Sequence, residues 1–206
     1  MTFLVSHRTC RIEICGGIAS GKTTLASLLR SDEIQVTYED FSSNPFWQAF
    51  YADPINTAFE TEITFLLQHY HQIKTASNLV KTFLCDFSLL QDYAYANVTL
   101  EGSRLSTFEQ VYREAGSHLS PPNLLIYLQC SPEVELERIR ARGREAEKSI
   151  TIDYLTSISN RLTTLISTLP PAQKVLAIDS GYYDFAHDSN TKILIVEQVL
   201  HQLAAT

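Results

Sequence analysis

The sequence predicts an α/β fold with a five-stranded parallel sheet and helices on both of its faces. Three observations support this prediction. Short apolar runs alternate along the chain with longer segments of helical periodicity. The runs are apolar almost throughout, which is typical of strands that are covered on both faces. A glycine-rich loop joins the first run to the first helical segment, so we expect a ligand site at the carboxyl ends of the strands.

The first strand, loop and helix form one unit. Residues 11–15 (RIEIC) are predicted as a strand and residues 24–30 (TLASLLR) as a helix. The loop between them, GGIASGKT from Gly16 to Thr23, fits the phosphate-binding pattern G-x-x-x-x-G-K-[ST]. In this context the N–H groups at the helix start point at the phosphates, Lys22 reaches the β and γ phosphates, and the Thr23 hydroxyl binds Mg²⁺. The unit therefore predicts binding of a nucleoside triphosphate.

The second strand is predicted over 34–38, and a loop rich in aromatic residues follows it. Asn-Pro and Asp-Pro pairs at 44–45 and 53–54 mark turns in this loop. A strong helix is then predicted over 58–74, because its apolar residues are spaced by three or four positions and form one stripe. The stripe consists of Phe59, Ile63, Leu66, Tyr70 and Ile73.

The remaining elements alternate between strands and helices. Strands are predicted over 79–85, 124–129 and 175–179, and helices over 89–100, 105–115, 152–169 and 191–203. Pro132 begins a further helix that ends at Arg142, since proline is favoured at the first helical position and acidic residues follow in the first turn.

The carboxyl ends of the predicted strands carry a set of polar residues. In a parallel sheet these ends meet at one edge, so the set predicts a site. Asp86 is expected to help hold magnesium, although an Asp in this position also starts turns. Glu39 is expected to be the general base that takes the proton of an attacking hydroxyl, with the adjacent Asp40 as the alternative. The five residues at the strand ends are Gly16, Glu39, Asp86, Gln129 and Asp179.

Positive charge is densest in a short arginine-rich segment that begins at Arg138. Arg138 and Arg142 share a helix face at i, i+4, and Arg144 follows Gly143. Phosphoryl transfer depends mainly on positioning and charge neutralisation, so this segment predicts a lid, at about residues 142–149, that closes over the phosphates. The alternative is a solvated helix face on which the arginines pair with neighbouring glutamates.

The acceptor is predicted from charge. Between Arg30 and Lys74 there is no Lys or Arg, whereas seven acidic residues occur. A nucleoside monophosphate, with its negative charges, would meet like charges there, so a neutral nucleoside in an aromatic-lined pocket fits better. Glu62 borders the apolar stripe of its helix; it either recognises a base or sugar or makes an ordinary polar contact at the edge of the core.

Composition limits the possible partners and the location of the protein. The formal net charge of −7 argues against general binding to nucleic acid or to a membrane surface. The four cysteines form no C-x-x-C pair, and the first ten residues carry no secretion signal. With no apolar run long enough to span a membrane, we expect a cytoplasmic protein of one domain, residues 1–206.

Taken together, these segments resemble the deoxynucleoside kinase family, in particular its bacterial deoxyadenosine/deoxyguanosine kinase branch. GGIASGKTT, residues 16–24, resembles the family's phosphate loop and extends the expected set to all of its residues: Gly16, Gly17, Ile18, Ala19, Ser20, Gly21, Lys22, Thr23 and Thr24. YEDFSSNPFWQAFYADP resembles the family's Y-E-P stretch, and PNLLIYLQCSPEVELERIRARGREAE resembles its strand, helix and arginine lid.

The resemblance implies roles for individual residues. Glu39 would be the catalytic base, while Tyr51 and Glu147 would meet the 3′-hydroxyl of the sugar. The lid residues Arg138, Arg142 and Arg144 would bind the donor phosphates. The fold would be that of a P-loop NTPase with strand order 2-3-1-4-5, and the protein would be a homodimer.

Two positions depart from the family pattern. After its third strand the family has Asp/Glu-Arg-Ser, whereas this chain has Asp86-Phe87-Ser88 and so lacks an arginine near the acceptor. Glu62 aligns with the glutamine that reads the base. An ionised Glu only accepts hydrogen bonds, so it favours a base edge with two donors, such as guanine.

The leading hypothesis is therefore an ATP- and Mg²⁺-dependent kinase that phosphorylates the 5′-hydroxyl of a purine deoxynucleoside. A nucleoside monophosphate kinase is the second hypothesis. The third is a regulatory protein that binds nucleotides but has lost turnover through the change at Phe87.

Overall fold

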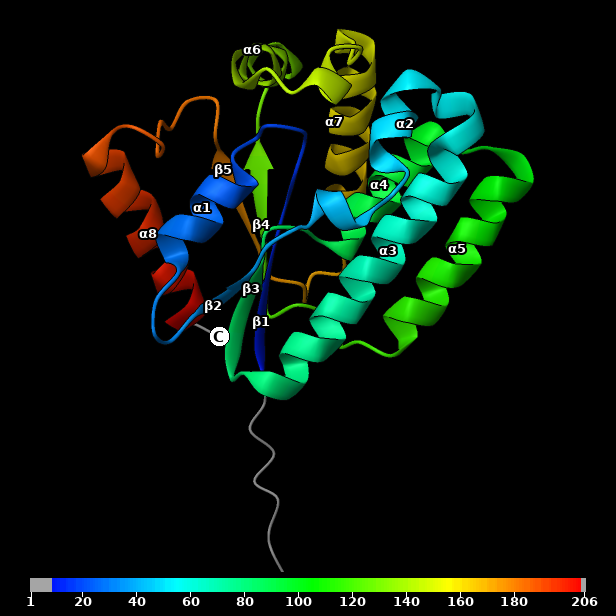
Figure 1. The fold of residues 1–206 in the computed structure, drawn as a ribbon. Helices are drawn as coiled ribbons and strands as arrows, with labels where there is room; N and C mark the ends of the chain where they lie inside the picture. The colour runs from blue at the N-terminus through cyan, green and yellow to red at the C-terminus, as the bar shows by residue number, and fades with distance from the viewer. Residues whose placement is uncertain (1–8, 205–206) are drawn as a thin grey trace, which may run out of the picture.

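A single parallel sheet forms the centre of the molecule, whose computed structural model describes residues 9–204. Its strands lie in the order β2-β3-β1-β4-β5 (Figure 1), which confirms the predicted fold class and strand order. Every strand pair is parallel. The strands are β1 (Cys10–Gly16), β2 (Gln35–Thr37), β3 (Thr82–Cys85), β4 (Leu124–Gln129) and β5 (Val175–Asp179).

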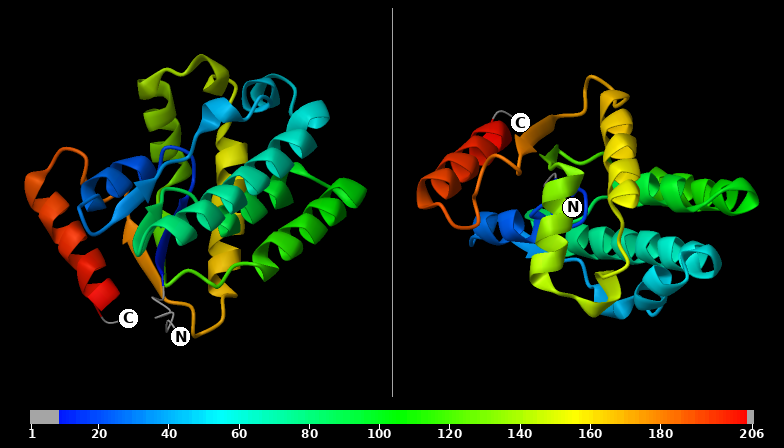
Figure 2. Two further views of the ribbon diagram at one scale, coloured as in Figure 1. Left: turned by 60° about the horizontal axis from the view of Figure 1, so that its bottom comes forward. Right: turned by 90° about the horizontal axis from the view of Figure 1, so that it is seen from above.

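Helices cover both faces of the sheet, as predicted. On one side lie α1 (Lys22–Leu29) and α8 (Ser189–Ala204); on the other lie α3 (Pro54–Leu79), α4 (Leu89–Thr99), α5 (Gly102–Ser117) and α7 (Ile152–Ser167) (Figures 1 and 2). Above the carboxyl ends of the strands lie α6 (Pro132–Arg142) and α2 (Trp47–Ala52) (Figure 1). The short helices η1 (Phe41–Ser43) and η2 (Glu145–Glu147) complete this upper layer.

Two apolar layers explain why the central strands are apolar on both faces. Along β1, Ile12 and Ile14 pack in one cluster with residues of α1 and α8. Cys15 points the other way, into a cluster with residues of α4 and α7. Alternate residues of a strand face opposite sides of the sheet, so both sets are buried. The strand that carries the phosphate loop is therefore held firmly from both sides.

The helix that leads to the arginine segment has well-formed ends. Ser131 accepts a hydrogen bond from the Val134 N–H, and Pro132 takes the first helical position. Gly143 ends the helix in the left-handed conformation, with φ of 64°. The predicted bounds of this helix are confirmed.

The segment between β2 and β3 differs from the prediction. Residues 47–52 form α2 where a loop was expected, because Asn44 fixes its start: its side chain accepts from Phe46 N–H and donates to the Thr61 carbonyl. The next helix, α3, begins at Pro54, capped by Asp53, and continues to Leu79. Strand β3 therefore begins at Thr82 and not at residue 79. Helix α5 also begins earlier than predicted, at Gly102.

Within the described residues, no helix is long and apolar enough to cross a membrane. The predicted lack of a secretion signal concerns residues 1–10; the first eight of these lie outside the described part of the chain.

Candidate active site

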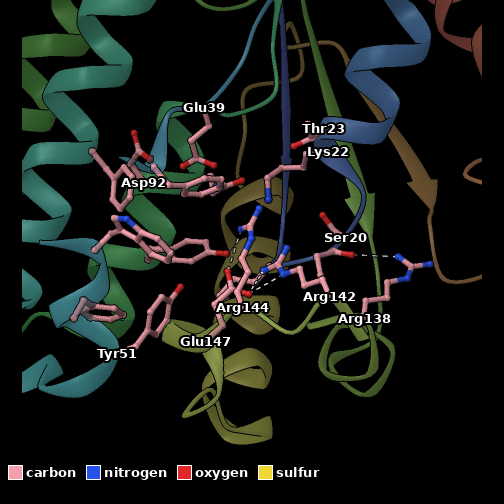
Figure 3. A pocket seen from close by; sticks show the side chains of 18 of the residues that line it. Ser20, Lys22, Thr23, Glu39, Tyr51, Asp92, Arg138, Arg142, Arg144 and Glu147 are labelled. Carbon is pink, nitrogen blue, oxygen red and sulfur yellow. Dashed lines mark hydrogen bonds and ion pairs between the residues drawn. The ribbon is translucent and has the colours of Figure 1, made fainter. Parts of the chain in front are cut away.

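A cavity of about 340 Å³ lies above the carboxyl end of β1. The phosphate loop forms one wall, the arginine segment a second, and α2, α3 and α4 the rest. Lys22 and Glu39, predicted to serve donor and acceptor, both line it and reach into it from different walls (Figure 3). Of the other predicted residues, those lining it are Ile18, Ala19, Ser20, Gly21, Thr23, Thr24, Tyr51, Glu62, Arg138, Arg142, Arg144 and Glu147.

The phosphate loop presents a compact charged surface to this cavity. Gly21 caps α1 with φ of 100°, a conformation that a side chain would strain. The Lys22 ammonium donates to the carbonyl oxygens of Gly16 at 3.0 Å and Gly17 at 2.9 Å. These carbonyls hold the ammonium group close to the helix N-terminus, where phosphate groups are favoured.

Thr23 and Asp86, the predicted magnesium residues, are in direct contact. The Thr23 hydroxyl donates to Asp86 Oδ2 at 2.7 Å. Both offer hard oxygen atoms, which is what Mg²⁺ prefers, so the pair fits the ion. Among the described residues no cluster of three or more metal-binding side chains exists.

Glu39 is held in place by its neighbours. Its backbone N–H donates to Asp86 Oδ1 at 2.6 Å, so the carboxylate beside Thr23 also fixes the start of the loop that carries Glu39. The Glu39 carboxylate, whose side chain is 10% exposed, lies 3.4 Å from the His69 ring. Asp40, the alternative base, is exposed and caps η1, so Glu39 is the residue that faces the cavity.

The arginines that follow α6 converge on one buried carboxylate. Glu147 accepts from Arg142 at 2.7 Å and from Arg144 at 3.2 Å (Figure 3). The Arg144 guanidinium also lies over the ring of Phe41, 5.2 Å from its centre. Arg142 and Arg144 both line the cavity, and their glutamate partner is Glu147 of the lid segment and not a glutamate on the same helix face.

Arg138 has different partners. It donates to the carbonyl of Ser180 at 2.7 Å and to that of Ala19 at 3.4 Å, apart from the pair on Glu147 (Figure 3). It therefore ties the phosphate loop to the segment that follows β5.

Aromatic rings form the outer wall of the cavity. Phe41 packs against Trp47, with ring centres 6.0 Å apart, and Trp47 packs against Tyr51 at 6.2 Å. Burial raises the pKa of the Tyr51 phenol above its ordinary value, so the hydroxyl stays protonated and can donate a hydrogen bond.

Glu62 is more deeply buried than its position beside the apolar stripe predicted. Only 4% of it is exposed, because the buried face of α3 turns toward α4 and includes Glu62 itself. The Thr99 hydroxyl donates to its carboxyl at 3.0 Å. Burial raises the pKa of Glu62 to about 8, so at pH 7 the protonated form prevails and the carboxyl can both donate and accept.

The sequence of the chain is similar to that of known proteins. A sequence model described as "dNK: Deoxynucleoside kinase" matches residues 12–204, which is nearly the whole chain. The chain belongs to the deoxynucleoside kinase family. The resemblance and the enzyme class expected from the sequence are thereby confirmed.

Individual relatives differ in the base that their names specify. A deoxyadenosine kinase of Dictyostelium discoideum is 30% identical over 72% of this chain, and the match spans 63% of that protein. The deoxyadenosine/deoxycytidine kinase of Bacillus subtilis (strain 168) is 27% identical over 91% of this chain and 90% of its own length. A deoxyguanosine kinase of Lactobacillus acidophilus is 25% identical over 93% of this chain and 90% of that protein.

Solved structures show the same fold. The deoxyadenosine kinase from M. mycoides with bound dCTP superposes with a TM-score of 0.79 at 20% identity, over 95% of this chain and all of that chain. The predicted P-loop NTPase fold is therefore confirmed.

Several residues of this deoxynucleoside kinase site were not predicted from the sequence, among them His69, Gln91 and Asp92. His69, on α3, contacts both Glu39 and Asp92, and its ring stacks on Phe87. A signal for His69 existed: it follows Glu62 by seven positions and Leu66 by three, so all lie on one helix face. No comparable signal marks Gln91 and Asp92, because α4 brings them to the cavity only through the tertiary packing of the family fold.

Two other predicted residues lie away from the cavity. Gln129 and Asp179 end neighbouring strands, but they line a separate hollow beside α6 and α7. Lys22, Glu39 and Asp86 follow the carboxyl ends of β1, β2 and β3. The ends of β4 and β5 do not contribute to this group.

Proposed function

We propose that this deoxynucleoside kinase transfers the γ-phosphoryl group of ATP to the 5′-hydroxyl of a purine deoxynucleoside, with Mg²⁺. One observation carries the proposal: Lys22 and Glu39 line a single cavity, between the phosphate loop and an aromatic wall. Magnesium, held beside Thr23 and Asp86 and by the phosphates, would neutralise charge on the transferring group.

Each wall supports one half of the reaction. On the donor side, Lys22 and the N–H groups at the start of α1 would bind the phosphates. Arg142 and Arg144 would close over the transferring group and stabilise its charge. On the acceptor side, Glu39 would take the proton of the 5′-hydroxyl as that oxygen attacks phosphorus, and Tyr51 and Glu147 would position the sugar.

A neutral acceptor is favoured over a monophosphate. The acceptor wall carries the carboxylates of Glu39 and Asp92, and Glu62, as a protonated carboxyl, adds no positive charge to it. The two lid arginines that line the cavity are already paired with Glu147. A second phosphate group on this wall would therefore meet carboxylates before it met an unpaired guanidinium.

Glu62 in its protonated form offers a donor and an acceptor side by side. This pattern pairs with a purine and equally with cytosine or thymine, so the preference for a purine rests on the relatives named for deoxyadenosine and deoxyguanosine. The Watson–Crick edge of adenine carries the complementary acceptor and donor, and that of guanine carries O6 and N1–H. The expectation from the sequence treated Glu62 as ionised; its raised pKa removes that premise at neutral pH, so both purines fit.

We also propose a homodimer in a reducing, cytoplasmic compartment. The four free cysteines Cys10, Cys15, Cys85 and Cys130 are consistent with that compartment. Size-exclusion chromatography with light scattering tests the dimer.

The activity is tested with γ-labelled ATP, Mg²⁺ and each of the four deoxynucleosides, and in parallel with the corresponding monophosphates. Labelled purine deoxynucleoside 5′-monophosphate is the expected product. Lys22→Ala should abolish transfer, whereas Lys81→Ala, at an exposed position, should not change it.

The other two hypotheses give different results in the same assay. Labelled diphosphates from the monophosphates would identify a nucleoside monophosphate kinase. Binding of ATP without transfer to any acceptor would identify a regulatory protein. Equal activity in Lys22→Ala and wild type would indicate a contaminating kinase.

A further inference from the structure

A buried histidine links the two carboxylates that face the acceptor. The His69 ring is 2% exposed and does not itself line the cavity. Its Nε2 lies 3.4 Å from Glu39 Oε1, and its Nδ1 lies 2.9 Å from both carboxylate oxygens of Asp92. Glu39 and Asp92 both line the cavity, so His69 can act on the substrate only through them.

Aromatic rings fix the plane of this histidine. Phe87 stacks on it with ring centres 4.0 Å apart and an angle of 11° between the planes. Phe65 stacks more loosely, at 5.8 Å and 26°. Phe87 is fully buried. It therefore gives the His69 ring an apolar platform.

The geometry favours the charged form of His69. A neutral imidazole has one N–H donor and one lone pair, and here both ring nitrogens face carboxylate oxygens. A lone pair directed at a carboxylate would be repelled, whereas an imidazolium donates to Asp92 and places its positive charge beside Glu39. The other charged group near the ring is Glu13 of β1, which is paired with Arg11 at 3.0 Å.

The energetics agree with this assignment. Burial alone would lower the pKa of His69, but the Asp92 carboxylate, and behind it that of Glu39, outweigh burial and raise the pKa to about 10. The ring therefore carries its proton throughout the neutral range.

We propose that His69, as an imidazolium held by Asp92 and Phe87, is the positioning residue of the Glu39 carboxylate. This rests on the proposed function of Glu39 as the base. The ion pair between the ring and Oε1, at 3.4 Å, orients the Glu39 carboxylate toward the attacking hydroxyl. A misplacement of about 1 Å at such a group costs about 10²-fold in rate.

The test is the steady-state kinetics of His69→Gln, which keeps a polar side chain but removes the charge. The expected result is a fall in kcat of about 10²-fold, with the KM for ATP unchanged. His71→Gln, an exposed histidine on the same helix, is the matched control and should behave as wild type. His69→Lys restores a cation and should recover part of the lost kcat.

A spectroscopic signature separates this role from a structural one. In nitrogen-15 NMR at pH 8, both ring nitrogens of His69 should be protonated in wild type. Asp92→Asn, which keeps the shape of the side chain, should shift the ring to a neutral tautomer and lower kcat. This variant carries the test if His69→Gln does not fold.

Several outcomes would overturn the proposal. A neutral His69 ring at pH 8 would do so, as would equal kcat for the Gln and Lys variants. So would a higher KM for the nucleoside at unchanged kcat, because that pattern indicates recognition of the base. If wild type itself transfers no phosphate, the proposed function fails instead, and the NMR result still decides the state of the ring.

Discussion

The two walls of the cavity are built in different ways. On the donor wall, Lys22 and the lid arginines Arg142 and Arg144 are basic side chains that lie within short segments of the sequence. On the acceptor wall, Glu39, Glu62 and Asp92 come from separate elements and are brought together by packing.

This difference shows where the chemistry depends on the environment. The charge of a guanidinium hardly changes with burial, so the donor wall acts as soon as the loop and lid form. The carboxyl groups of Glu62 and Asp92 have raised pKa values because they are buried. The acceptor wall is therefore tuned by tertiary packing, and substitutions on it should change pH dependence and selectivity.

The largest effect on the acceptor wall is expected for Glu39→Gln. Without the base, kcat should fall about 10²- to 10⁴-fold at saturating ATP, while the KM for ATP stays close to wild type. Steady-state kinetics with a fixed deoxynucleoside measure this. Glu60→Gln, at an exposed position on α3, is the control. A variant that retained wild-type kcat would remove Glu39 from the mechanism.

A smaller effect, confined to the donor, is expected for the lid. Arg142→Gln and Arg144→Gln should each lower kcat/KM for ATP by about 10- to 100-fold, because each removes a positive charge that would stabilise the transferring phosphoryl group. Arg140→Gln, at an exposed position two residues before Arg142, should have no effect. If the lid variants changed base preference and left ATP kinetics alone, the division between the two walls would be wrong.

The donor wall could be predicted from sequence because its geometry is local. The spacing of Gly16, Gly21 and Lys22 fixes a backbone shape, and the helix after it orients the N–H groups. The ends of α6 were predicted for the same reason, since Pro132 and Gly143 each satisfy a local requirement of the backbone. The strand order followed from resemblance to the family.

The acceptor wall could be predicted only in part. The aromatic segment was recognised, but its helix α2 was not, because the contact of Asn44 with Thr61 that fixes it is tertiary. On α3 the apolar stripe placed Glu62 at its edge without predicting its burial, and His69 was not singled out, although both lie on the buried face of the helix. Their hydrogen-bond partners lie on α4, which the sequence of α3 alone does not show.

Base preference offers a milder test of the acceptor wall. Glu62 has a pKa of about 8, so a rise in pH from 6.5 to 9 converts a donor–acceptor pair into an acceptor only. The ratio of kcat/KM for deoxyguanosine to that for deoxyadenosine should therefore rise about fivefold. The ratio cancels the titration of groups that affect both substrates equally.

Glu62→Gln provides the control, since its amide does not titrate in this range. The ratio should be flat with pH in this variant and should lack the guanine preference of wild type at high pH. A flat ratio in wild type would mean that Glu62 does not contact the base.

The least effect on activity is expected at Glu135, an acidic group behind the donor wall. It is 1% exposed, and its side chain fills the space beside Gly17, where a Cβ would clash with it. Burial raises the pKa of Glu135 to about 8, although Lys22 and Arg138 oppose this. Here the protonation of a donor-side group depends on packing, as it does on the acceptor wall.

The consequence is a defined pH dependence of stability. Between the ordinary pKa of a Glu and about 8, the folded protein binds more protons at Glu135 than the unfolded chain does. The free energy of unfolding that this group contributes is therefore present at low pH and lost as the pH rises through that window. Thermal unfolding between pH 5 and 8 should show a shallower decline for Glu135→Gln than for wild type or for the exposed control Glu133→Gln. An unchanged slope would show that Glu135 is ionised beside Lys22, and the contrast between fixed donor charges and tuned acceptor groups would then hold without exception.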